Sequence, residues 1–383
     1  NGAPARFPLE QRGFHSSGLE KSRQLEARGA IGVVTLRDPD EEARRPWALD
    51  APNWRRPGMR LVDEQGAPVD DFPGLKVRAG LRTGMAALLL EGSGVSAEEL
   101  WAMRSSGTLR RFELAGKATL ASPARIDRVA SDNVLAKLPG SDPALGAQHV
   151  LLSAHLDHLG FGAAADGDTI YNGALDNALG IAILLEAARA LHAEPPRRSV
   201  LFLATTAEEK GLLGAFHYAR APTVPLDSLV ANVNMDMPII LTPLSDAIPI
   251  GIEHSSLQCM VERVAKELGI ALTPDPFPEE VVFIRSDQYA FIRAGVPAVY
   301  LDGGAASTEP GVDGLALMRE FLGQHYHRPS DDLSRPIHWP SAARLALLNQ
   351  RIAREIGNAD ERPRWNAGDF FGERFGTAAT KTR

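Results

Sequence analysis

Cysteine is almost absent from this chain: Cys259 is the only one among 383 residues. A single cysteine excludes a disulfide within the chain and any zinc site built on cysteine thiolates. Long apolar runs are missing as well. Stretches such as Ile181–Leu185 and Val200–Ala204 are far shorter than the roughly 18–20 residues that span a bilayer. The sequence therefore predicts neither a disulfide-stabilised protein nor a membrane-spanning one.

An excess of positive charge is also lacking, since 41 Lys and Arg residues stand against 48 Asp and Glu, for a net charge of −7. No basic patch large enough to follow a phosphate backbone is present, which argues against a nucleic-acid partner. Internal repeats and low-complexity tracts are absent. What remains is an ordinary globular composition, 44% hydrophobic and 23% charged, at a length typical of about two domains.

The first of these domains is predicted to occupy residues 1–115. Its short apolar runs, set among Pro, Gly, Arg and Asp, are typical of strands joined by loops. They lie at Ala30–Leu36, Leu75–Val77 and Ala86–Leu90. A helix over Gly18–Arg28 precedes the first of them. We expect a small, β-rich domain here. Its end is marked over 104–125, where short apolar runs among turn residues give way to a longer alternation of strands and helices.

The second domain, over 116–383, alternates longer strands and helices. Continuous apolar runs, typical of strands buried on both faces, occur at His149–Ala154, Ser199–Ala204, Leu229–Met235 and Ala298–Leu301. Helices are predicted over Asp176–His192, Leu257–Leu268, Ser286–Ala294 and Trp339–Ile356. This alternation predicts a three-layer α/β/α sandwich with a mixed, largely parallel sheet. A polar, Gly-rich tail from Gly357 onward is expected to lie on the surface.

Side chains able to bind a metal follow the buried strands and open the first long helix. They are His155-Leu156-Asp157-His158, Asp176-Asn177, Glu208-Glu209, Asp236 and the late loop His325–Asp332. Because sites in open α/β sheets gather at the carboxyl ends of the strands, we expect these groups to meet at one edge.

Each group taken alone has an ordinary structural interpretation. Asp176 suits a helix N-cap, and Glu208-Glu209 suits the acidic first turn of a helix. Together the groups bring several carboxylates to one place without a basic partner for each, an arrangement that bound cations usually stabilise. Histidine and carboxylate ligands without cysteine favour zinc in a catalytic rather than a structural site.

Seven short motifs occur along the chain in the order seen in a known family. They are HLDHLG at 155–160, NGALDNALG at 172–180, AEEKGLLG at 207–214, NMDM at 234–237, RSD at 285–287, GVP at 295–297 and HRPSD at 327–331. Over 127–356 the chain resembles the co-catalytic two-zinc aminopeptidases related to aminopeptidase S, aminopeptidase Y, glutamate carboxypeptidase and the transferrin receptor. The preceding segment resembles a protease-associated domain more loosely, mainly through Lys21–Leu36 and Ala86–Gly94.

The resemblance implies two zinc ions per chain and a set of five ligands. In this family pattern Asp176 bridges both ions. His155 and Asp236 complete one site, and Glu209 and His327 complete the other. The first imidazole fits the spacing His-x-Asp, and the last fits His-x-Pro-x-Asp.

Three further residues are implied to act in catalysis. Glu208 is the general base, which takes a proton from water and passes it to the leaving amine. Asp157 orients His155, as the imidazole ligands of metals generally require. Tyr326, directly before the last ligand, occupies the place where some relatives carry an oxyanion-stabilising hydroxyl.

Some residues depart from the pattern or compete with it. His158 and His325 are neighbouring rivals of the two assigned imidazoles. Arg328 follows the last ligand where relatives often have a small hydroxyl residue, and Arg285 opens the RSD motif. Either arginine is an ordinary surface residue or binds a substrate carboxylate in bidentate fashion. Asn177 is the third residue assigned to substrate binding.

The resemblance implies a metallo-aminopeptidase that hydrolyses the N-terminal peptide bond of peptides. A carboxypeptidase or dipeptidase of the same family is the first alternative, with an arginine holding the free carboxylate. A catalytically inactive, receptor-like binding module is the second, although the complete ligand set argues against it. Glutaminyl cyclisation is more remote, because the relatives that perform it bind a single zinc. The first residues, from Asn1 onward, do not resemble a signal peptide, so the location is not predicted from them. The family resemblance implies a periplasmic or secreted location.

Overall fold

The computed structural model describes residues 7–51, 54, 56–69, 72–121 and 123–381. The chain separates into two compact units. The first comprises Asn1–Pro57, Val62–Val129 and Glu279–Val281, and the second comprises Gly58–Leu61, Ala130–Pro278 and Val282–Arg383. Every residue predicted to form the metal site belongs to the second unit.

Helices predominate in the first unit. They are α1 (Leu9–Ser16), α2 (Gly18–Glu26), α3 (Pro39–Arg44), α4 (Trp47–Asp50), α5 (Ala86–Leu90) and α6 (Ala97–Ser105), with a 3₁₀ turn η2 (Thr83–Met85). In the described part of this unit, β1 (Gly32–Leu36) pairs in parallel with β2 (Val77–Leu81) as a two-stranded sheet. The helix expected over Gly18–Arg28 and the strand expected over Ala30–Leu36 are confirmed.

The structure corrects the expected β-rich character of this unit. Ala86–Leu90, predicted as a strand, forms helix α5, because Ala and Leu are strong helix formers and the run has no β-branched side chain. Helix α6 then begins at a capping box in which Ser96 and Glu99 exchange hydrogen bonds. The assignment of 1–115 as a protease-associated domain stays a prediction.

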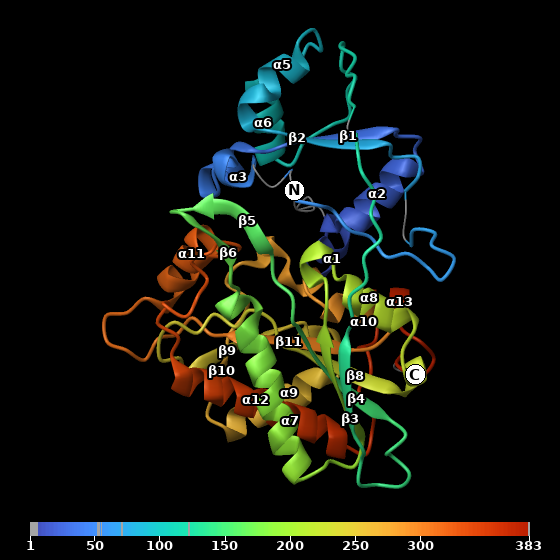
Figure 1. Ribbon diagram of the computed structural model, residues 1–383, viewed down its shortest axis with the longest axis vertical. Coiled ribbons are helices and arrows are strands. Elements are labelled where there is room, and N and C mark those ends of the chain that lie inside the picture. The colour runs from blue at the N-terminus through green and yellow to red at the C-terminus, as the bar shows by residue number, and fades with distance from the viewer. Residues whose placement is uncertain (1–6, 52–53, 55, 70–71, 122, 382–383) are drawn as a thin grey trace. The chain divides into compact units, whose positions relative to one another are not determined.

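The second unit is built on a mixed sheet whose described strands run in the order β10-β9-β11-β8-β4-β7-β3 (Figure 1). They are β3 (Val134–Leu138), β4 (His149–His155), β7 (Ser199–Thr205), β8 (Leu229–Asn234), β9 (Asp246–Ile250), β10 (Ala271–Leu272) and β11 (Ala298–Gly303). The β4–β7, β4–β8, β8–β11 and β9–β10 pairs are parallel, whereas β3–β7 and β9–β11 are antiparallel. The predicted mixed, largely parallel sheet is confirmed.

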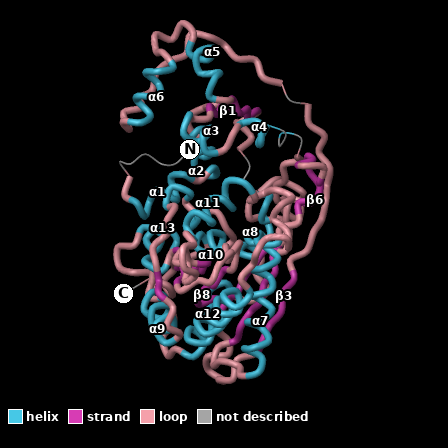
Figure 2. Tube along the Cα trace, turned by 90° about the vertical axis from the view of Figure 1, so that its left-hand side faces the viewer, coloured by secondary structure: helices cyan, strands magenta, loops and turns pink. Residues whose placement is uncertain are grey.

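Helices cover both faces of this sheet, and Figure 2 shows them in cyan around the strands in magenta. They are α7 (Gly180–Ala193), α8 (Leu213–Arg220), α9 (Leu257–Glu267), α10 (Gln288–Arg293), α11 (Gly314–Gln324), α12 (Trp339–Asn358) and α13 (Phe370–Phe375). Along β4, Val150 and Leu152 pack in a core with α7, α9 and α12, whereas Leu151 packs with α8 and α10. The three-layer architecture is therefore confirmed.

Short elements connect these layers. They are η3 (Ala174–Leu179), η4 (Glu208–Lys210), η5 (Leu226–Ser228), η6 (Ile252–His254), η7 (Pro278–Glu280), η8 (Val282–Ile284) and a hairpin of β5 (Gly160–Ala165) and β6 (Asp168–Tyr171). The hairpin and η3 lie between the predicted ligands His155 and Asp176 in sequence. None of the described helices is both long and apolar enough to cross a bilayer.

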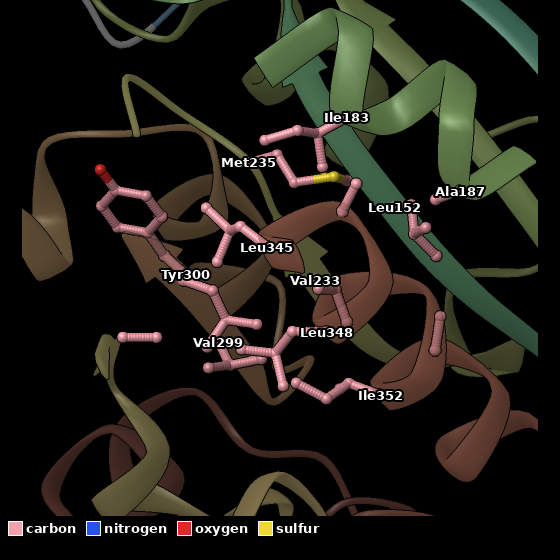
Figure 3. Packing of buried hydrophobic residues seen from close by; sticks show 14 of the residues in the cluster. Leu152, Ile183, Ala187, Val233, Met235, Val299, Tyr300, Leu345, Leu348 and Ile352 are labelled. Carbon is pink, nitrogen blue, oxygen red and sulfur yellow. The ribbon is translucent and has the colours of Figure 1, made fainter. Parts of the chain in front are cut away.

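The larger core fixes the strand end on which the site is built. Figure 3 shows Ile183 of α7 beside Met235, which follows β8, and Val233 of β8 in the same cluster as Leu348 of α12. Tyr300 of β11 lies at the edge of this cluster with its hydroxyl directed away from the apolar side chains. That hydroxyl donates a hydrogen bond to the backbone oxygen of Asp236, at 2.8 Å. The core thus anchors the chain directly after β8.

The chain after α12 is more deeply packed than expected. Trp365 and Phe371 are 1% and 0% exposed, and the Trp365 indole N–H donates to the Gly295 backbone oxygen at 3.0 Å. The expectation of a polar surface tail is wrong for this stretch, because its few aromatic residues are enough to dock it on the sheet layers.

Candidate metal centre

Three neighbouring parallel strands deliver the predicted ligands to one edge of the sheet. β4 ends in His155, β7 is followed by Glu208 and Glu209, and β8 is followed by Asp236. Since β4 lies between β7 and β8 and runs parallel to both, their carboxyl ends point the same way. Asp176 reaches this edge from η3, just before α7.

The first cluster joins His155 with Asp176 and Asp236. His155 Nε2 lies 2.9 Å from Asp236 Oδ1 and 3.2 Å from Asp176 Oδ1. Burial of the imidazole works to lower its pKa, but the two carboxylates outweigh burial and raise the pKa of His155. One donor atom from each residue lies within 4.8 Å of the other two. This spacing fits a single metal ion.

The second cluster shares Asp176 and adds Glu209 between two imidazoles. His327 Nε2 lies 3.3 Å from Asp176 Oδ2 and 3.1 Å from Glu209 Oε2. His158 Nδ1 lies 2.8 Å from Glu209 Oε1, and donor atoms of His158, Asp176 and Glu209 fall within 4.8 Å of one another. Burial works to raise the pKa of Glu209, but the two imidazoles outweigh it and lower that pKa to about 2.

The charge of these clusters suits a divalent cation. Among the described residues, Asp176, Glu209 and Asp236 form ion pairs with imidazoles alone, and an imidazole that ligates a metal is neutral. The Oε1 atom of Glu209 is buried without a hydrogen-bond donor among the described residues. Buried carboxylates in this state are costly unless a cation neutralises them. Nitrogen and carboxylate donors without sulfur fit zinc.

Glu208 and Glu209 are presented differently by one turn. Ala207 adopts a left-handed conformation with φ of 55°, and the Asp157 carboxylate accepts the backbone N–H groups of Glu208 at 3.0 Å and Glu209 at 3.3 Å. Burial raises the pKa of Glu208, and the nearby Asp236 carboxylate adds to this effect. The two adjacent glutamates therefore have pKa values shifted in opposite directions, which suits them to different chemical roles.

Asp157 contacts His155 through a different group from the one expected. His155 Nδ1 lies 2.9 Å from the Asp157 backbone oxygen, whereas the nearest carboxylate oxygen is 3.9 Å away. The carboxylate is engaged by the backbone of the two glutamates, so the carbonyl oxygen takes its place as acceptor. A backbone carbonyl is a common acceptor for the second nitrogen of a ligating imidazole.

Tyr326, Arg285 and Arg328 border the second cluster. The Tyr326 ring stacks on His327 with centroids 3.8 Å apart, and burial raises the pKa of its phenol, which therefore keeps its proton. Arg285, which is exposed, donates to the Tyr326 hydroxyl at 3.5 Å. Arg328 donates to the His327 backbone oxygen at 3.4 Å. The structure thus brings the predicted phenol and both predicted arginines to one side of the ligands.

Asn177, predicted to bind substrate, uses its amide within the protein. It is 3% exposed. Its Nδ2 donates to the Met235 backbone oxygen at 3.0 Å, and its Oδ1 accepts the backbone N–H groups of Gly180 and Met237, each at 3.1 Å. These bonds hold the chain on both sides of Asp236 and give Asn177 a positioning role. Its contact with substrate stays a prediction.

The two histidines that compete with the assigned ligands, His158 and His325, lie in different surroundings in the structure. His325 Nδ1 lies 2.8 Å from Ser330 Oγ and its Nε2 lies 3.1 Å from Arg335, so its ring is engaged outside both clusters. His158, in contrast, lies inside the second cluster with His327. The His-x-Asp spacing favours His155 over His158 as the first ligand, yet both imidazoles contact Asp176, and each also contacts a carboxylate of its own: Asp236 for His155 and Glu209 for His158.

Asp331 is a positioning residue that the sequence analysis did not single out. It is fully buried, and its Oδ1 and Oδ2 accept the backbone N–H groups of Leu175 at 2.9 Å and Asp176 at 3.1 Å. Its position at the end of the HRPSD motif, four residues after His327, is the sequence feature that could have indicated this role. One carboxylate therefore ties the loop of the last ligand to the shared ligand.

Replacing Asp331 with asparagine is expected to weaken zinc binding about 10–100-fold, the usual effect of losing a group that orients ligands. The amide keeps one acceptor but turns an N–H₂ group towards a backbone N–H. Equilibrium zinc titration of the metal-stripped chain measures the effect. Asp332→Asn is the matched control, because the Asp332 carboxylate accepts the backbone N–H of Ser334 within its own turn, at 2.8 Å. An Asp331→Asn chain with the affinity of the unmodified chain contradicts this role.

A three-layer α/β unit with imidazoles and carboxylates converging at the carboxyl edge of its sheet is typical of metal-dependent hydrolases. The chain belongs to peptidase family M28, whose family model matches residues 133–353. This match covers every residue of both clusters. It confirms the family resemblance seen in the motifs.

Individual relatives match shorter parts of the chain. A probable zinc metalloprotease of Pyrenophora tritici-repentis (strain Pt-1C-BFP) is 40% identical over 65 residues, which are 17% of this chain and 15% of that protein. Aminopeptidase YwaD of Bacillus subtilis (strain 168) is 36% identical over 89 residues, which are 23% of this chain and 18% of that protein. The matched segments thus span less than a fifth of these curated relatives.

Solved structures with lower sequence identity also align with this chain. The zinc aminopeptidase BSAP from Bacillus subtilis aligns with a TM-score of 0.44 and 22% identity, over 60% of this chain and 50% of that one. The aminopeptidase from Aneurinibacillus sp. strain AM-1 aligns with a TM-score of 0.48 and 18% identity, over 89% of this chain and 66% of that one.

Proposed function

We propose that this chain is a zinc-dependent aminopeptidase that holds two zinc ions and hydrolyses the N-terminal bond of peptides. The observation that carries the proposal is the position of Asp176, whose two oxygens face different imidazoles, His155 at 3.2 Å and His327 at 3.3 Å. A carboxylate between two such clusters suits a pair of ions about 3.5–4 Å apart, as two-metal hydrolases have. Asp236 and Glu209 complete the two ligand sets.

Charge supports two ions rather than one. The three carboxylates that face the imidazoles carry three negative charges when ionised, against four positive charges on two zinc ions. The bound ions would lower the pKa of the attacking water and polarise the scissile carbonyl. A single ion would leave one net negative charge buried at the edge of the sheet, which is unfavourable.

Glu208 is the proposed general base. Burial raises the pKa of Glu208, which makes it a stronger base for a proton that it must take up from water. It takes a proton from the attacking water and passes it to the leaving amine. Asp157 fixes this residue by accepting its backbone N–H. The protonated Tyr326 hydroxyl is the proposed donor to the negative charge that develops on the substrate oxygen.

The proposed direction of cleavage rests on the sign of the charge around the ligands. Glu208 and Asp236 offer carboxylates to a free α-amine, and the net charge of −7 favours cationic substrates over anionic ones. Arg285 and Arg328 support the alternative, a carboxypeptidase or dipeptidase, because a guanidinium binds a free carboxylate well. Arg285 donates to the Tyr326 hydroxyl, so any carboxylate it holds would lie beside that phenol.

Other parts of the proposal come from the family resemblance. They are a protease-associated domain over 1–115, a catalytic domain over 116–383 and a secreted or periplasmic location. The inactive, receptor-like alternative is disfavoured by the complete ligand sets and by Glu208, since a module that only binds does not require them.

A panel of matched dipeptides tests the proposed activity. With zinc present, the free dipeptide and its C-terminally amidated form are expected to be hydrolysed, whereas the N-acetylated form is not. A chelator is expected to abolish hydrolysis, and added zinc to restore it. Hydrolysis of the acetylated dipeptide but not of the amidated one would place the chain with the carboxypeptidases. Absence of hydrolysis in a chain that contains zinc would favour the binding module.

A further inference from the structure

His158 is a buried imidazole that is not among the five proposed metal ligands and has no other proposed role. Its side chain is 7% exposed, and neither of its ring nitrogens has a hydrogen-bond partner among the described residues. Leaving buried polar atoms in this state is costly, so such an atom in a folded protein usually serves a bound ion, a water or a reaction. The partner of His158 is therefore to be sought among what its nitrogens face.

The Nδ1 atom of His158 faces the second cluster. It lies 2.8 Å from Glu209 Oε1 and 3.8 Å from Asp176 Oδ2. Around a tetrahedral ion with bonds of about 2.0–2.1 Å, neighbouring donor atoms lie roughly 3.3 Å apart. The contacts of His158 bracket this value, and those of His327 with the same two carboxylates, 3.1 and 3.3 Å, agree with it.

The two imidazoles approach Glu209 from different sides. His158 faces its Oε1 and His327 its Oε2, and the two rings meet edge to face with centroids 5.7 Å apart. The short contact between His158 and Glu209 lacks the alignment of a hydrogen bond, since both Nδ1 and Oε1 remain without partners. Donor atoms that approach closely without being aligned are typical of ligands that point at a common centre.

The backbone of the loop before Asp176 fixes the His158 ring. Gly173 adopts φ of 69°, and a Cβ atom built on it would lie 2.6 Å from Cγ of His158. Any larger residue would push the imidazole away from Glu209. The loop that presents the shared ligand therefore packs directly on this imidazole, and His158 is held in place by the same segment that delivers Asp176.

We propose that His158 Nδ1 is a sixth metal ligand, which gives the second site four protein donors against three at the first. The donors of the second site are then His158, His327, Glu209 and the shared Asp176. The additional imidazole makes this the tighter site, and the ion held by His155 and Asp236 is the one that exchanges first. This inference rests on the two-ion function proposed above.

Calorimetric zinc titration of the metal-stripped, full-length chain tests the inference. The unmodified chain is expected to bind two ions with unequal affinities. His158→Ala is expected to weaken the tighter site by at least about 100-fold, beyond the roughly 10–100-fold lost with an outer, orienting group. His158→Asn, whose amide oxygen takes the place of Nδ1, is expected to lose less. His192→Asn is the matched control, because His192 is exposed near the end of α7.

The zinc–nitrogen distance separates a ligand from a residue that only positions Glu209. In a crystal structure of the zinc-loaded chain, Nδ1 of His158 is expected at about 2.0–2.1 Å from the ion. A distance beyond about 3 Å, or unchanged zinc affinity in a folded His158→Ala chain, overturns the inference. Binding of a single ion by the unmodified chain instead contradicts the two-ion function, and the distance from Nδ1 to that ion still decides the role of His158.

Discussion

Replacing Glu208 with glutamine is expected to lower turnover by about 10²–10⁴-fold while the zinc content stays unchanged. Glutamine keeps the shape of the side chain and the backbone N–H that Asp157 accepts at 3.0 Å. It removes only the ability to take a proton from water. The variant should therefore fold, bind zinc and bind substrate, with the loss confined to kcat. Elemental analysis and steady-state kinetics on the same preparation measure the two quantities.

Glu209→Gln is the matched control, because the two residues are adjacent and the substitution is the same. Glu209 has an imidazole on each of its oxygens, so its loss should empty one metal site. If Glu208→Gln loses zinc while Glu209→Gln retains it, the roles of the pair are reversed. Retention of full turnover by Glu208→Gln would remove it from the mechanism altogether.

The ligand positions could be predicted because the strands that carry them have a simple pattern. The runs His149–Ala154, Ser199–Ala204 and Leu229–Met235 are largely apolar in the sequence, and polar residues follow each of them. The carboxyl ends of parallel strands meet at one edge of a sheet, so the residues that follow are expected there. His155, Glu209 and Asp236 meet there as expected.

Contacts that depend on loop geometry could not be read in this way. His327 adopts a left-handed conformation, with φ of 59°, which residues other than glycine and asparagine seldom adopt. Asp331 reaches the backbone of Asp176 across 155 residues of sequence. Neither this conformation nor this contact produces a periodic pattern in the sequence from which it could be predicted. The same holds for His158, whose role depends on which side of Glu209 it approaches.

The expectations for Ala86–Leu90 and for the Asp157 carboxylate were wrong for local reasons. Ala86–Leu90 was expected as a strand because it is a short apolar run between turns, a pattern that does not distinguish a strand from a helix. Its residues favour the helix that forms. Asp157 was expected to orient His155, but its carboxylate accepts the backbone N–H groups of Glu208 and Glu209 at the start of η4, because the first N–H groups of a helical turn have no partner within it.

Replacing Asp176 with asparagine is expected to lower the zinc content from about two ions per chain to fewer than one and to abolish hydrolysis. An asparagine amide offers one neutral oxygen where the carboxylate offers two charged ones, so it cannot serve His155 and His327 at once. The charge of the ligand set also falls from three to two against the four positive charges of two zinc ions, which weakens both sites. Elemental analysis after dialysis against low zinc measures the loss.

Asp236→Asn is the matched control, because the Asp236 carboxylate pairs with His155 of the first cluster and, among the described residues, forms no ion pair with an imidazole of the second. This variant is expected to keep close to one ion, held by the second cluster. The comparison isolates the bridging role, since both substitutions remove one carboxylate from a buried position near the same imidazole. If Asp176→Asn and Asp236→Asn retain the same number of ions, Asp176 serves a single site, and the two clusters do not share a ligand.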